Sequence, residues 1–192
     1  MKKFSLLLAM LMLASLMLTA CGQSASSSAA SESAPAESTS EPAEEDEENY
    51  ETGDASLDDP RNGDEIGEKE LLVVSFGTSF NDSRRLTIGA VEGALEKAFP
   101  EYSVRRGFTS QIIIDHVAKR DGEIIDNMQE ALDRAVNNGV KTLVVQPTHL
   151  MNGLEYEEMS DAIAQYSDAF EQVSIGQPLL TSDEDFQAVA KA

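Results

Sequence analysis

From Lys69 onward, short apolar runs alternate with longer segments in which apolar residues recur at helical spacing. The apolar runs have the composition of strands that are buried on both faces of a sheet. They span residues 71–76, 102–108, 142–146 and 173–175. Strands connected by helices predict βαβ units with right-handed crossovers. The pattern therefore predicts a layered α/β fold, a parallel sheet with flanking helices.

The segments between these runs carry the signals of amphipathic helices. Pro100 ends the first helix, and Gly139 provides a left-handed stop after the third. The apolar positions recur three or four residues apart, as expected for one helix face. They are Ile88, Val91, Leu95 and Phe99; residues 112–117; Ile124, Met128, Leu132 and Val136; Leu154, Met159, Ile163 and Tyr166; and a last helix over residues 183–192.

The N-terminus follows neither pattern. Lys2 and Lys3, an apolar run over residues 6–17 that is short for a membrane-spanning helix, and small residues before Cys21 are typical of a bacterial lipoprotein signal peptide. We predict a signal peptide over residues 1–20 and lipidation of Cys21, which would anchor the exported chain to the outer face of the cell membrane. An ordinary secretory signal with an incidental cysteine is the alternative, and it also implies export.

Charge is distributed unevenly along the 192 residues. The formal net charge is -21, and residues 23–60 contain many acidic residues but no lysine or arginine. Because residues 21–68 are rich in Ser, Ala, Glu and Pro, we predict that they form a disordered acidic tether. The run over residues 44–48 has the alternative role of collecting metal ions, although such runs are more commonly solvated spacers. The acidic balance argues against nucleic-acid binding.

The remaining part, residues 69–192, forms the predicted folded domain. It contains no cysteine, because the single cysteine is Cys21, so disulfides and thiolate metal ligands are excluded. A sheet of three or four strands is small for this architecture. We expect that a second, C-terminal lobe is absent, and the alternative is a complete minimal domain. A lone lobe would bury little surface, and a homo-oligomer could then complete a cleft.

Three polar loops are predicted at one edge of the sheet, where the carboxyl ends of parallel strands meet and ligands bind. Two of them provide the candidate substrate-binding residues, and the third contains His149. These hydroxyl residues also have a structural alternative, because Ser and Thr cap helices that follow. Their convergence with a histidine favours binding. The candidates are Gly77, Thr78, Ser79, Thr109 and Ser110.

His149 is the candidate catalytic residue. Pro147 constrains the chain before it and Gly153 permits a turn after it, which predicts an imidazole at the mouth of the cleft. A histidine can accept a proton near neutral pH or bind a divalent cation through a neutral nitrogen. Glu155 is a candidate second metal ligand. Its alternative role, shared with Glu157, is that of an ordinary acidic residue in the first turn of a helix.

The sequence lacks the motifs that are typical of several other kinds of chemistry. The chain has no GxxxxGKS phosphate loop, so we expect no nucleotide, and residues 77–81 lack the second glycine of a hydrolase elbow. Residues 77–79 precede a helix and can accept an anionic group. Arg84 and Arg85 are close enough to assist with a carboxylate-rich ligand, although our default expectation is that both are exposed. His116 is interpreted as a solvated helix residue.

Six dispersed segments of this region, together with their order, resemble the anaerobic sirohydrochlorin cobaltochelatase family, the class II or CbiK-type chelatases. The resemblance covers nearly all of residues 70–192. It implies the N-terminal lobe of a two-lobed α/β chelatase with a tetrapyrrole cleft between the lobes. The segments are residues 73–79, 87–90, 105–110, 144–149, 153–156 and 176–180.

By this resemblance, the chain inserts divalent cobalt, or alternatively iron or nickel, into sirohydrochlorin without a nucleotide, in anaerobic cobalamin biosynthesis. The family's metal-binding and proton-accepting histidine matches His149, and Glu155 is a candidate for its acidic partner. The family's second histidine lies in a Gly-His segment of the second lobe, and this sequence ends before such a segment. Two alternatives are a non-catalytic surface lipoprotein that binds metal or a haem-like tetrapyrrole, and a surface module that only binds a partner.

Overall fold

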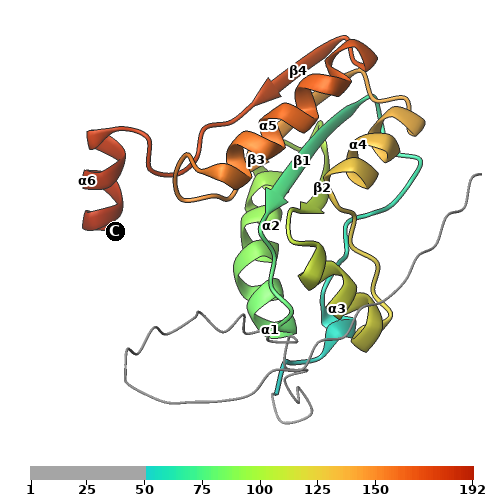
Figure 1. The fold of residues 1–192 in the computed structure, drawn as a ribbon, viewed down its shortest axis with the longest axis vertical. Helices are drawn as coiled ribbons and strands as arrows, with labels where there is room; N and C mark the ends of the chain where they lie inside the picture. Colours follow the sequence, from blue (N-terminus) through green and yellow to red (C-terminus); the bar gives the residue numbers. More distant parts are fainter. Residues whose placement is uncertain (1–50) are drawn as a thin grey trace, which may run out of the picture. The chain divides into compact units, whose positions relative to one another are not determined.

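The computed structural model describes residues 51–192, so the predicted signal peptide, Cys21 and the first part of the predicted tether lie outside the described residues. Within residues 51–192, four parallel strands form one sheet in the order β2-β1-β3-β4 (Figure 1). The predicted parallel α/β sheet is confirmed. The strands are β1 (Lys69–Ser75), β2 (Ser103–Phe108), β3 (Thr142–Pro147) and β4 (Gln172–Ile175).

The helices also follow the predicted order. They are α1 (Asn81–Ser83), a π-helical segment (Arg84–Ile88), α2 (Gly89–Ala98), α3 (Gln111–Asp121), α4 (Met128–Asn137), α5 (Leu154–Tyr166) and α6 (Asp183–Lys191). Ile124 was expected to lie in the helix that corresponds to α4, but it precedes the first residue of α4. The reason is a capping box, in which Asn127 and Glu130 bond to each other's backbone N–H and fix the start of α4. Among the described helices, none is long and apolar enough to span a bilayer.

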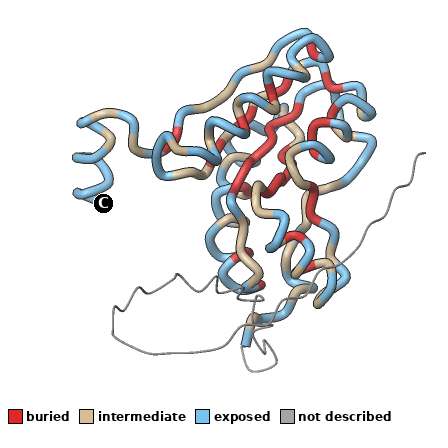
Figure 2. The backbone as a smooth tube through the Cα atoms, in the orientation of Figure 1, coloured by how far each residue is buried: buried red, intermediate tan, exposed pale blue. Residues whose placement is uncertain are grey.

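The central strand β1 is buried on both faces, as its continuous apolar run predicts. On one face, Leu72 and Val74 pack with apolar residues of α4 and α5. On the other face, Leu71 and Val73 pack with Val104 and with Leu95 of α2. Figure 2 shows this buried interior running through the sheet and the inner sides of the helices. The sheet is therefore a rigid platform whose strand ends are fixed by core packing.

Residues 51–68 pack against this domain, and we call them the N-terminal strap. The carboxylate of Asp58 forms ion pairs with Arg84 and Arg106, whose side chains are fully buried. For residues 51–68, the prediction of a disordered tether is wrong. Their acidic composition predicted a solvated segment, whereas some of these carboxylates neutralise arginines of the folded domain.

Candidate functional site

The carboxyl ends of the strands bring the predicted loops together at Ser75, the last residue of β1. The Ser75 carbonyl accepts a hydrogen bond from the Thr109 N–H at 2.9 Å. The Ser75 hydroxyl accepts a hydrogen bond from the Thr148 hydroxyl at 2.8 Å. Thr109 follows β2 and Thr148 precedes His149, so the loops after three strands meet at one edge. The convergence that the pattern predicts is therefore present in the fold.

The loop after β1 is shaped by Gly77. Its φ of +100° lies in the left-handed region, and a Cβ at this position would lie 2.5 Å from the Phe108 ring, so a side chain cannot be accommodated. The Thr78 hydroxyl accepts a hydrogen bond from the Phe80 N–H at 3.3 Å, which closes a local turn. The Ser79 carbonyl accepts a hydrogen bond from Arg120 at 2.6 Å. Backbone contacts thus hold this loop in place.

The hydroxyls after β2 are not used as helix caps. Ser110 is the N-cap residue of α3, but its side chain makes no capping hydrogen bond. The Thr109 hydroxyl oxygen is buried and has no hydrogen-bond partner within residues 51–192. An unbonded hydroxyl in a shielded position is costly to the fold. The capping alternative therefore does not account for either residue.

His149 lies in the loop between β3 and α5, beside the loop that follows β4. Its carbonyl accepts a hydrogen bond from the Leu179 N–H at 3.0 Å, and the Leu150 carbonyl accepts one from the Leu180 N–H at 2.7 Å. The imidazole is half-buried. Both ring nitrogens are shielded from solvent, and neither is hydrogen-bonded to any residue of the described chain. Hydrogen bonds thus hold the backbone of this loop, whereas the imidazole forms none within the described chain.

The electrostatics of His149 favour its neutral form. Burial lowers the pKa of the imidazole below its ordinary value of 6.5, and the negative charge of Glu155 partly offsets this effect. A neutral imidazole with an unused lone pair can bind a divalent metal ion or accept a proton. His116, which we interpreted as solvated, is partly buried on α3.

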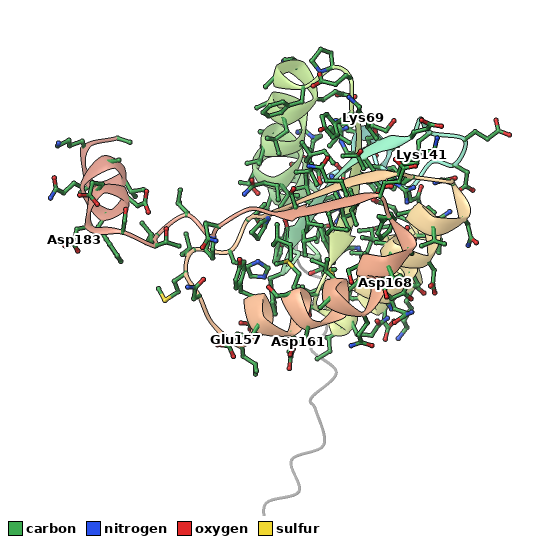
Figure 3. The ribbon with its side chains drawn as sticks, turned by 90° about the horizontal axis from the view of Figure 1, so that it is seen from above. Lys69, Lys141, Glu157, Asp161, Asp168 and Asp183 are labelled. Atoms are coloured by element: carbon green, nitrogen blue, oxygen red, sulfur yellow. The ribbon has the colours of Figure 1, made fainter. Side chains whose placement is uncertain are left out.

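Glu155 is exposed in the first turn of α5. It lines a hollow of about 290 Å³ that also contains Thr109, Asn127 and Glu158. Within residues 51–192, no three His, Cys, Asp or Glu side chains are grouped closely enough to hold a metal ion. At this edge the imidazole of His149 is accompanied by the nearby carboxylate of Glu155. Figure 3 shows that Glu157 lies on the side of α5 away from the sheet.

Exposed apolar side chains follow the carboxyl end of every strand. We call them the strand-end apolar rim. Ile112, in the first turn of α3, is 81% exposed, and Leu154 at the start of α5 is 66% exposed. Soluble proteins seldom leave many large apolar side chains in water near one edge unless a ligand or partner covers them. The rim consists of Phe76, Ile112, Leu150, Met151, Leu154 and Leu179.

Sequence reasoning missed Ser75 and misjudged the burial of Arg84. Ser75 was treated as part of the apolar strand, although a hydroxyl residue at the end of an apolar run is a signal for a strand-end contact. Arg84 was expected to be exposed, but its side chain is fully buried and donates a hydrogen bond to the Thr78 carbonyl at 3.3 Å. No local signal indicated that Arg84 is buried, because its acidic partners Asp58 and Glu123 are distant in the sequence.

Comparison with known proteins identifies the family to which residues 69–192 are similar. The family model described as Cobalt chelatase (CbiK) matches residues 69–192. A sirohydrochlorin cobaltochelatase of Salmonella typhimurium (strain LT2) is 36% identical over 124 residues, which are 65% of this chain and 47% of the relative. The chain thus spans about half the length of this curated relative. Because the family match covers most of the sequence and the whole sheet, the chain belongs to the cobalt chelatase (CbiK) family.

Proposed function

We propose that this chain acts in cobalt chelation, inserting Co²⁺ into sirohydrochlorin for anaerobic cobalamin biosynthesis. In this reaction Co²⁺ enters the macrocycle as two pyrrole N–H protons leave. The observation that carries the proposal is the imidazole of His149, which is anchored by its backbone at the strand ends and has both ring nitrogens unbonded within the described chain. Membership of the cobalt chelatase (CbiK) family supports the same reaction.

In this proposal His149 performs the metal and proton chemistry. Its neutral imidazole binds Co²⁺ in place of a water ligand or accepts a pyrrole proton, and its lowered pKa keeps it unprotonated near neutral pH. Glu155 supplies a negative charge near the imidazole and assists with the departing protons or the arriving cation. No nucleotide takes part.

The remaining strand-end residues bind the macrocycle. Sirohydrochlorin has an apolar, flat ring with carboxylate substituents. The strand-end apolar rim supplies surface for the ring. Gly77, Thr78, Ser79, Thr109 and Ser110 supply hydroxyl and backbone groups for the carboxylates.

A turnover assay tests the proposal. The full chain is mixed with sirohydrochlorin and Co²⁺, and metal insertion is followed by the change in the absorption spectrum. We expect insertion well above the uncatalysed rate, and a decrease of at least about 100-fold in His149→Ala, in line with the loss of a positioned proton acceptor. His116→Ala is the matched control and should retain the wild-type rate. Binding without acceleration in the wild-type chain would instead favour a non-catalytic tetrapyrrole-binding or metal-binding lipoprotein.

Cobalt is the proposed substrate metal, with iron and nickel as slower alternatives. The imidazole and carboxylate groups of His149 and Glu155 suit several divalent ions of this series. Insertion rates for Co²⁺, Fe²⁺ and Ni²⁺ under the same anaerobic conditions would rank them. A rate with Ni²⁺ or Fe²⁺ above that with Co²⁺ would reject the proposed order.

We also propose that the chain is exported and anchored to the outer face of the cell membrane through lipid on Cys21. The support is the N-terminal pattern of Lys2, Lys3, the apolar run and the cysteine. Mass spectrometry of the protein from its host should find an acylated N-terminal Cys21. An intact N-terminus starting at Met1 would contradict export by this route.

The oligomeric state is a further part of the proposal. The strand-end apolar rim on two copies can face each other and enclose the macrocycle between two His149 residues. The high negative charge opposes such an association, so it should strengthen with added salt. Light scattering that finds only monomer in both low and high salt would reject the homo-oligomer.

A further inference from the structure

The N-terminal strap carries the countercharge for a buried pair of arginines. Asp58 Oδ2 lies 2.6 Å from Arg84 Nε and 2.7 Å from Arg106 Nη1. Both arginine side chains are fully buried, and that of Asp58 is 3% exposed. Burial disfavours the Asp58 anion, but hydrogen bonds and charge from Arg106 and Arg84 hold its pKa below the ordinary value. The strap therefore supplies negative charge that neutralises buried arginines of the domain.

Backbone contacts dock the strap on β2, which is an edge strand of the sheet. The Arg61 carbonyl accepts hydrogen bonds from the Arg106 N–H at 3.2 Å and from Arg105 Nε at 3.0 Å. The Gly63 carbonyl accepts one from Arg105 Nη1 at 2.8 Å. These bonds satisfy part of the open edge of β2 and a buried guanidinium, so they fix the position of Asp58.

A second set of contacts joins the strap to the start of α1. The Thr52 carbonyl accepts a hydrogen bond from the Asp82 N–H at 2.9 Å, and the Gly53 carbonyl accepts one from Asn81 Nδ2 at 3.1 Å. Asn81 immediately follows the loop of residues 77–80. The strap thus contacts both the strand before the Thr109 loop and the helix after the Gly77 loop.

The Arg84 guanidinium connects the strap to the candidate site. It donates to Asp58 from Nε, to Glu123 Oε2 from Nη2 at 2.7 Å, and to the Thr78 carbonyl from Nη1 at 3.3 Å. A planar guanidinium held by two carboxylates has one remaining direction, which is toward Thr78. The Arg84 guanidinium therefore links Asp58 to the Thr78 carbonyl.

We infer that Asp58 is a positioning residue, which through Arg84 holds the loop of Gly77, Thr78 and Ser79 in the shape that faces the strand-end site. The match to the family model begins at residue 69 and leaves out the strap. The contact between Asp58 and Arg84 therefore joins a residue outside the matched region to one inside it. The expected effect on tetrapyrrole binding rests on the proposed function, whereas the positioning of the loop is independent of it.

Hydrogen exchange on the full chain tests the inference. Asp58→Asn removes a buried countercharge, so some protection should be lost throughout the domain. We expect amide exchange at residues 78–80 to rise by about fivefold or more beyond any increase at the β3 amides, because the loop also loses its direct support. The matched control is Asp59→Asn, which makes the same change on the adjacent exposed residue. Sirohydrochlorin should bind Asp58→Asn about threefold to tenfold more weakly than the wild type or the control.

Arg84→Lys provides a second variant in case Asp58→Asn does not fold. Lysine keeps the positive charge beside Asp58 and Glu123, but a single ammonium cannot reproduce the three-way contact of the guanidinium. We expect the same local increase in exchange, while Arg85→Lys, the neighbouring control, should match the wild type.

Two outcomes overturn the inference. One is wild-type exchange at residues 78–80 in folded Asp58→Asn or Arg84→Lys. The other is an equal loss of protection in the loop and in β3, which would mean that the contact only stabilises the whole domain. If the wild-type chain binds no sirohydrochlorin, the proposed function fails, and the exchange data still decide whether Asp58 positions the loop.

Discussion

The domain contains two regions of shielded polar groups, and they differ in how those groups are satisfied. Beneath the strap, Arg84 and Arg106 are fully buried, and each is bound by two or more carboxylates. At the strand ends, the nitrogens of His149 and the hydroxyl oxygen of Thr109 have no hydrogen-bond partner within residues 51–192. Buried polar groups are normally paired when their role is structural. The difference therefore separates paired groups that hold the fold from shielded groups that the described chain leaves unpaired.

The largest expected effect comes from breaking the satisfied region. In Arg106→Ala, the carboxylates of Asp58 and Glu92 would remain buried without their shared partner, and we expect the free energy of unfolding to fall by about 3–5 kcal/mol. Urea denaturation measures this change. Arg85→Ala is the control, because its ion pair with Asp82 is exposed and should contribute less than about 1 kcal/mol. Equal effects of the two substitutions would contradict the structural role of the buried pair.

Glu70 is an exception that sharpens the comparison, because it is buried in β1 with both carboxylate oxygens unbonded within the described residues. Burial raises its pKa from the ordinary value of 4.5 to about 7, although Arg105 opposes the shift. The folded state thus binds this proton more tightly than the unfolded state. The free energy of unfolding should therefore fall as pH rises from about 4.5 to about 7, by on the order of 3 kcal/mol.

Glu70→Gln isolates this effect, because its side chain does not titrate. Urea denaturation between pH 4.5 and 8 should show a flatter profile for Glu70→Gln than for the wild type. Glu68→Gln, an exposed neighbour paired with Lys141, is the control and should keep the wild-type slope. Identical slopes for Glu70→Gln and the wild type would mean that Glu70 does not carry the pH dependence.

A smaller effect on stability is expected at the strand ends. His149→Ala removes an imidazole that forms no hydrogen bond within the described chain, so the free energy of unfolding should change by less than about 1 kcal/mol. Isothermal titration of the same variant with Co²⁺ should show much weaker binding. Loss of several kcal/mol of stability in His149→Ala would place the ring among the groups that hold the fold.

The smallest expected effect concerns the charge near His149. NMR titration of the imidazole should give a pKa below 6.5 in the wild type, because burial disfavours the cation. In Glu155→Gln the pKa should fall further, because the opposing negative charge is removed. Glu157→Gln, on the outer side of α5, should leave it unchanged. A higher pKa in Glu155→Gln would contradict this arrangement.

Much of the fold was predictable because its signals are local. The apolar run of β1, the capping residues and the stop at Gly139 identify strands and helices without knowledge of tertiary contacts. The position of His149 was also accessible, since Pro147 and the preceding apolar run place it after a strand end. Ile124 was assigned to a helix because its spacing fits, but the capping box at Asn127 starts α4 later.

The strap and the buried arginines were not predictable in the same way. Asp58 pairs with Arg84 and Arg106, which lie 26 and 48 residues away in the sequence. An isolated acidic segment has no local pattern that distinguishes a solvated tether from a source of countercharge. Nothing in the sequence distinguishes Arg84 and Arg106 from ordinary surface arginines, and only the tertiary fold places them beneath the strap.

The central claim is that the imidazole of His149, which forms no hydrogen bond within residues 51–192, binds Co²⁺. Co²⁺ is paramagnetic, so its addition to the full chain tests this claim by NMR through the two histidine side chains. We expect the His149 ring signals to broaden or shift at low Co²⁺ concentration while those of His116 stay unchanged. Unaffected His149 signals, or equal effects on both histidines, would contradict the account.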